Sequence, residues 1–253
     1  MIEITASDVT FSAYRADPDG APKGAVVILQ DIFGVTADIR AIADGYAAAG
    51  YVAVAPALFD KVRPGVELAP AAAEEGRALS AEVGTDWPLE AIAATVETLR
   101  PAGKVALVGY SWGGFLAYLA GNRVKGLACA VGYHAEGLGD AASEKRRIPT
   151  LIHFAEADAA VPDEERIQFR ARRPDVSAFS YPGAARGFDF PASPAFDATV
   201  AETARSRTLG WMAQYVVGAP PAQMKNAGAY AQAKTEKKGK KKPEGDDLGP
   251  PMN

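Results

Sequence analysis

The sequence predicts one α/β domain in which a mostly parallel central sheet carries helices on both faces. Strand-like and helix-like segments alternate from residue 25 to residue 215, which is typical of sheets built from strand-helix-strand units. Residues 25–30 begin with a run of five apolar side chains, as expected for a strand covered on both faces. The chain has 253 residues with 48% hydrophobic content, which suits one large core and is short for two.

The first two strands differ from the rest. Residues 2–5 and 9–16 alternate apolar and polar side chains and are followed by the turn signal DPDG at 17–20, so we expect an antiparallel pair at the sheet edge. Apolar residues spaced as on one helix face follow at 39–47, and Gly50 ends that helix. Further strands are expected at 51–57, 104–110, 127–133, 151–157 and 177–181, and further helices at 68–83, at 88–99, from 111, after 162 and across 200–215.

Charge and composition limit the possible partners. The net charge of −4 gives no general attraction to nucleic acid or to acidic membranes, so we expect neither as a partner. The N-terminus lacks the basic and long apolar regions of a signal peptide, and no apolar stretch reaches the roughly 18 residues of a membrane span. The only cysteine, Cys129, lies in an apolar run. We therefore expect a cytoplasmic protein.

The composition changes near the C-terminus. Residues 225–253 contain seven lysines and four acidic residues but no isoleucine, valine, phenylalanine or tryptophan. Such a segment cannot bury enough apolar surface to offset the entropy lost on ordering. We expect a folded domain over residues 1–220 and a disordered lysine-rich tail over 221–253. The alternative role for the tail is a weak anion- or partner-binding arm.

The motif that carries chemistry is GYSWG at residues 109–113, which matches G-x-S-x-G. A predicted strand precedes it and a helix-compatible run follows it, which is the context of a nucleophilic serine on a sharp turn. Ser111 is the candidate nucleophile, and the backbone N–H groups of Trp112 and Ile32 are the candidate oxyanion donors. The alternative is a glycine-rich turn needed only for helix packing.

A carboxylate that orients a catalytic base should follow one or two strand-helix units later. Asp158 lies just past the predicted strand at 151–157, where it would reach the same sheet edge as Ser111. Glu156 is a competing candidate. Asp158 could instead be an ordinary turn or cap residue.

These residues resemble the dienelactone hydrolase family over roughly residues 10–215. The resemblance rests on four blocks: QDIFG at 30–34, GYVAVAPALF at 50–59, VGYSWGG at 108–114 and YPGAARGF at 181–188. It implies an α/β-hydrolase fold and hydrolysis of a small carboxylic ester or lactone through an acyl-enzyme. It also implies that neither a metal nor an organic cofactor takes part.

Three positions depart from the family pattern. Ser111 stands where the family commonly has a cysteine, and Asp31 stands where it commonly has a glutamate that contacts the nucleophile. Arg186 stands where the family has its histidine, and a guanidinium with a pKa above 12 cannot accept the serine proton. We therefore expect impaired activity, and we expect Arg186 to pair with Asp158.

The sequence contains only two histidines. His153 lies in an apolar run and is expected in the core. His134 follows the strand at 127–133 and so lies near the catalytic edge, either as a substitute base or as a wall of the pocket. Phe33, Tyr110, Trp112 and Phe188 are candidates for lining an apolar substrate pocket, with core packing as the alternative for each.

Two functions follow from this. The first is a serine hydrolase of small esters or lactones, weakened by Arg186. The second is a catalytically disabled relative that binds a small carboxylate through Arg186, since arginine pairs well with carboxylates. The residues specify neither a particular substrate nor an oligomeric state.

Overall fold

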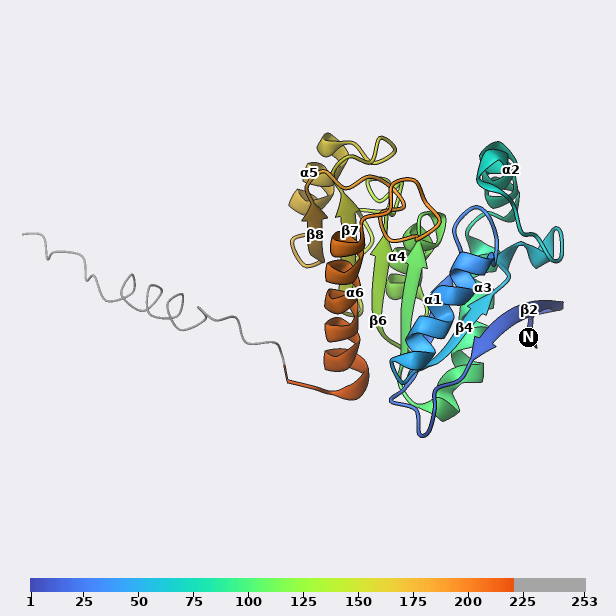
Figure 1. The fold of residues 1–253 in the computed structure, drawn as a ribbon. Coiled ribbons are helices and arrows are strands. Elements are labelled where there is room, and N and C mark those ends of the chain that lie inside the picture. The colour runs from blue at the N-terminus through green and yellow to red at the C-terminus, as the bar shows by residue number, and fades with distance from the viewer. Residues whose placement is uncertain (221–253) are drawn as a thin grey trace, which may run out of the picture. The chain divides into compact units, whose positions relative to one another are not determined.

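One eight-stranded sheet organises the described part of the chain (Figure 1). The structure is a computed structural model that describes residues 1–220, and Met1–Ala219 form one compact unit. The tail predicted over 221–253 lies outside the described residues. The strands are β1 (Ile2–Ala6), β2 (Val9–Ala16), β3 (Ala25–Leu29), β4 (Val52–Pro56), β5 (Val105–Tyr110), β6 (Leu127–Tyr133), β7 (Thr150–Ala155) and β8 (Ser177–Tyr181).

The strand order is β1-β2-β4-β3-β5-β6-β7-β8. β2 runs antiparallel to both of its neighbours, and every pair from β4 to β8 is parallel. The expected antiparallel pair at one edge and the mostly parallel sheet are therefore confirmed. β3, β4 and β5 are buried along their whole length, which explains why their sequences are apolar without alternation.

Helices cover both faces of this sheet. They are α1 (Ala37–Ala48), α2 (Ala73–Val83), α3 (Asp86–Leu99), α4 (Trp112–Arg123), α5 (Asp163–Arg172) and α6 (Ala198–Met212). Buried residues of α1 and α6 share one core cluster, on the near side of the sheet in Figure 1. Buried residues of α3 and α4 form a second core cluster. This cluster also contains the side chains of β3 and β5 that point to the other face of the sheet. None of the helices within residues 1–220 combines the length and apolarity needed to cross a bilayer.

The helices form where the apolar spacing predicts them. In α1 the buried side chains include Ile39, Ala43 and Tyr46, one stripe of the helix. α2 begins at Ala73, five residues later than expected, because Pro70 opens a short 3₁₀ turn and Leu68 donates its backbone N–H to the Phe33 carbonyl instead (2.8 Å). The last helical turn ends at Gly218, whose backbone has the left-handed conformation (φ 87°).

The parallel strands bring their carboxyl ends to one edge of the sheet. Asp31, Ser111, His134, Asp158 and Arg186 follow β3, β5, β6, β7 and β8 respectively, within five residues of each strand end. Ligand sites of such sheets lie at this edge, so the topology alone gathers the candidate residues there.

Candidate active site

Ser111 sits on a strained turn between β5 and α4. Its backbone has φ 53° and ψ −115°, which non-glycine residues rarely adopt, and its N–H donates to the Tyr133 carbonyl (2.8 Å). The turn is crowded: a Cβ on Gly113 would lie 2.7 Å from the carbonyl oxygen of Leu29, and a Cβ on Gly109 would collide with the Gly113 backbone. The glycines of the motif thus let α4 start close against β3 and hold the serine at the sheet edge.

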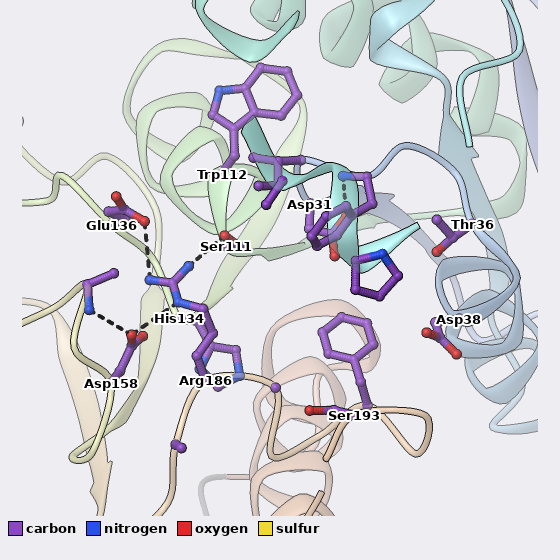
Figure 2. Close-up of a pocket in the computed structure, with 18 of the residues that line it drawn as sticks. Asp31, Thr36, Asp38, Ser111, Trp112, His134, Glu136, Asp158, Arg186 and Ser193 are labelled. Carbon is purple, nitrogen blue, oxygen red and sulfur yellow. Dashed lines mark hydrogen bonds and ion pairs between the residues drawn. The ribbon is translucent and has the colours of Figure 1, made fainter. Parts of the chain in front are cut away.

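The Arg186 guanidinium lies among three oxygen-bearing side chains (Figure 2). Nη1 donates to Ser111 Oγ at 2.7 Å, Nε donates to Asp158 Oδ1 at 3.1 Å, and Nη2 is 3.2 Å from Glu136 Oε2. The expected pairing of Arg186 with Asp158 is confirmed. Since every guanidinium nitrogen is a donor, Arg186 orients the serine oxygen but cannot take its proton.

Backbone contacts hold the loops that carry Asp158 and Arg186. Asp158 Oδ1 accepts the N–H of Ala160 (3.0 Å), and Ala157 N–H donates to the Ala184 carbonyl (2.8 Å), which ties the two loops together. The Asp158 side chain is 3% exposed, whereas Glu156 points to solvent. Of the two acidic residues after β7, Asp158 is therefore the one that contacts Arg186 at the site.

Asp31 lies on the loop after β3, with Ile32 and Phe33 beside it in the cavity wall. Burial raises its pKa to about 6, although the Phe33 N–H, which donates to Oδ1 at 2.8 Å, acts in the opposite direction. The loop is fixed by Gln30, whose buried side chain accepts the Leu58 N–H (3.0 Å). No hydrogen bond joins Asp31 to Ser111 in the described structure.

The two histidines occupy different environments. His153 is fully buried, with Nδ1 2.7 Å from the Tyr181 hydroxyl and Nε2 3.0 Å from Thr208 Oγ1, so its predicted core position is confirmed. Burial, helped by the nearby Arg207 charge, lowers the pKa of His153 to about 3. His134 lines the active-site cavity, which agrees with its predicted place at the catalytic edge.

A cavity of about 840 Å³ opens above Ser111. Phe33 and Trp112 line it as predicted. Tyr110 and Phe188 do not: both are buried in the core beneath it, 4% and 0% exposed, so their assignment to the pocket was wrong. Both belong to the core cluster that also contains the buried residues of α1 and α6.

Phe190 takes the lining role that sequence reasoning gave to Phe188. Glu136, Asp189 and Phe190 were missed because each lies in an irregular loop, where no periodicity indicates direction. The alternation of Phe188 and Phe190 was the one available signal. Within residues 1–220, the His, Cys, Asp and Glu side chains form no group of three or more that could hold a metal ion.

Comparisons with known proteins identify the relatives of this chain. The model of the dienelactone hydrolase family matches residues 11–216. A carboxymethylenebutenolidase of Cupriavidus pinatubonensis is 33% identical over 84% of this chain and 95% of its own length. One from Pseudomonas putida is 32% identical over 81% of this chain and 91% of its own. A dienelactone hydrolase-like promiscuous phosphotriesterase from metagenomic libraries shares the fold, with a TM-score of 0.70 at 18% identity, covering 85% of this chain and 97% of its own.

Proposed function

The chain belongs to the dienelactone hydrolase family, and on that premise we propose that it hydrolyses a small carboxylic ester or lactone through an acyl-enzyme on Ser111. The relatives' printed name, carboxymethylenebutenolidase, supports a lactone as one substrate class. We place the reaction in the cytoplasm, on the evidence of the sequence.

The observation that carries the proposal is the 2.7 Å hydrogen bond from Arg186 to Ser111 Oγ. Ser111 lies on a strained turn at the start of a helix. A fixed positive charge beside the serine oxygen favours the alkoxide as the proton leaves. The start of α4 adds backbone N–H groups and the positive end of the helix dipole.

The remaining residues fit named roles in this reaction. Ser111 Oγ attacks the ester carbonyl, and the N–H groups of Ile32 and Trp112 stabilise the negative charge that develops on the carbonyl oxygen. Asp158 keeps the Arg186 guanidinium pointed at the serine. The site lacks a base between Asp158 and Ser111, so we expect slow turnover. Oxyanion stabilisation and substrate binding alone can still raise the hydrolysis rate by about 10³- to 10⁴-fold over the rate in water.

The binding alternative has less support. Arg186 already faces two carboxylates, Asp158 at 3.1 Å and Glu136 at 3.2 Å, so a ligand carboxylate would have to displace one of them. Asp31 and Asp38 also line the cavity and disfavour an anion there.

The test is a panel of short activated esters and lactones, combined with a fluorophosphonate probe. Ser111→Ala should lose both turnover and labelling. Arg186→His should raise ester turnover by roughly one to three orders of magnitude, because a ring at 186 would stand between Asp158 and Ser111 as a general base. Labelling that survives Ser111→Ala would contradict the proposal. Absence of turnover in both wild type and Arg186→His, with small carboxylates bound less tightly by Arg186→Ala, would favour the binding function.

A further inference from the structure

A second imidazole-carboxylate pair lies at the same cavity. His134 follows β6, and its Nε2 is 2.7 Å from Asp189 Oδ1 in the loop that carries Arg186. The two side chains are 1% and 8% exposed, so water does not compete for this contact. Phe188 packs edge-on against the imidazole, with ring centroids 4.9 Å apart, and fixes the plane of the ring. The pair is therefore a well-ordered unit.

This pairing leaves one ring nitrogen available. An ionised carboxylate only accepts hydrogen bonds, so His134 Nε2 carries a proton toward Asp189, and in the neutral tautomer Nδ1 has the free lone pair. Nδ1 is buried and has no hydrogen-bond partner among the described residues. A catalytic role is one explanation for a buried polar atom without a partner, and here the atom belongs to a residue that lines the active-site cavity. The arrangement matches the way a carboxylate orients a catalytic histidine.

The backbone of His134 points to the same conclusion. Its φ of 51° is in the left-handed region, which among the described non-glycine residues is shared only by Ser7 and Ser111. Ser7 lies in the turn between β1 and β2, whereas Ser111 and His134 follow the neighbouring strands β5 and β6 at the cavity. Strained backbone of this kind is retained mainly at functional positions.

No other described residue offers an imidazole nitrogen without a hydrogen-bond partner at the site. Arg186 cannot accept a proton, and both ring nitrogens of His153 are already hydrogen-bonded in the core. We propose that His134, oriented by Asp189, is the general base of the reaction and replaces the base that Arg186 cannot be. This proposal rests on the proposed hydrolase function.

His134 carries the serine proton to the leaving group. As the Ser111 Oγ–carbonyl bond forms, the serine proton passes to His134 Nδ1. The resulting imidazolium, stabilised by Asp189, returns the proton to the leaving oxygen as the ester C–O bond breaks. In the second half, water attacks the acyl carbon and gives a proton to Nδ1, which passes that proton to Ser111 Oγ as the acyl C–Oγ bond breaks. The sum is ester plus water to acid plus alcohol.

The decisive variant is His134→Gly, because glycine adopts φ 51° without strain and leaves a space for free imidazole. Ester turnover should fall by about 10²- to 10⁴-fold, and added imidazole should restore part of it. Asp189→Asn should also reduce turnover, but should add little loss in the His134→Gly background. Ser7→Gly makes the same backbone change at the β1–β2 turn and should leave turnover, with or without imidazole, as in wild type.

A double variant tests whether His134 is a general base or only a positioning residue. Combining Arg186→His with His134→Gly should restore turnover, because a ring at 186 would then supply the base. Turnover of His134→Gly within a few-fold of wild type would overturn the proposal. So would a loss that neither imidazole nor Arg186→His repairs, since His134 would then only hold the loop. Either result leaves the hydrolase function standing as long as Ser111→Ala removes turnover.

Discussion

Arg186 has five N–H groups and no lone pair, and its three nitrogens face Ser111, Asp158 and Glu136. A guanidinium has donors only, so it can stabilise an alkoxide but cannot accept a proton. Under our proposals the chemistry at this site is divided between residues: Arg186 supplies electrostatic stabilisation, and His134 supplies proton transfer. A histidine between Asp158 and Ser111 would combine both tasks in one side chain.

Asp31 is a second residue whose environment predicts a measurable effect. Its pKa is about 6 in the folded protein against an ordinary value of 3.8, because burial penalises the carboxylate. Between these two pH values the folded state binds more protons than the unfolded state, so this group's contribution to stability falls as pH rises through the window. Asp31→Asn should therefore stabilise the protein by about 1–3 kcal/mol above pH 6 and not below pH 4.

Thermal unfolding at pH 4 and pH 8 checks this. The melting temperature of Asp31→Asn should exceed that of wild type by several degrees at pH 8 only. Asp19→Asn, in the exposed turn after β2, serves as the matched control and should show no such difference between the two pH values. An equal shift at both pH values would mean that the amide acts through packing rather than through charge.

Among the secondary-structure elements, α4 sets the position of Ser111, because the helix begins directly after this residue and packs closely against the sheet. α4 is buried around most of its circumference, and its first turn lies against the end of β3 through Gly113. The same contact brings the Gln30–Ile32 backbone near the serine. A larger residue at 113 would have to push α4 away from the backbone of Leu29 and Gln30.

Two helical glycines test this. Gly113→Ala should lower the free energy of unfolding by about 1–3 kcal/mol, because its Cβ would lie 2.7 Å from the Leu29 carbonyl oxygen. Gly210→Ala, on the exposed side of α6 with no atom near the new Cβ, should raise it by about 0.5–1 kcal/mol. Urea unfolding of both variants measures the difference. A stabilising effect at 113 would show that α4 can move away at no cost.

At the scale of the whole molecule, the charge is unevenly distributed along the sequence. The segment 225–253 carries seven lysines and four acidic residues, a net +3. Subtracting this from the total of −4 leaves −7 on residues 1–224. The catalytic domain is thus more acidic than the whole chain.

Removing residues 225–253 tests whether the domain depends on that segment. We expect the melting temperature to change by less than about one degree and ester turnover to stay within twofold, because the segment lacks the apolar residues needed to dock on the domain. Calorimetry and the ester panel, with full-length protein as the control, measure both. A loss of several degrees would show that the segment packs against the domain.

The sequence alone determined those features that have local causes. Apolar runs and helical spacing predicted the strands and helices to within a few residues, and GYSWG between a strand and a helix predicted the turn of Ser111. Asp158 and Arg186 were predictable as neighbours because parallel strands end at one edge. Tertiary structure alone decided the loop contacts. His134 and Asp189 are 55 residues apart, and nothing local links them. Phe188 turns inward and Phe190 toward the cavity because packing around an irregular loop, not periodicity, sets the direction of each side chain.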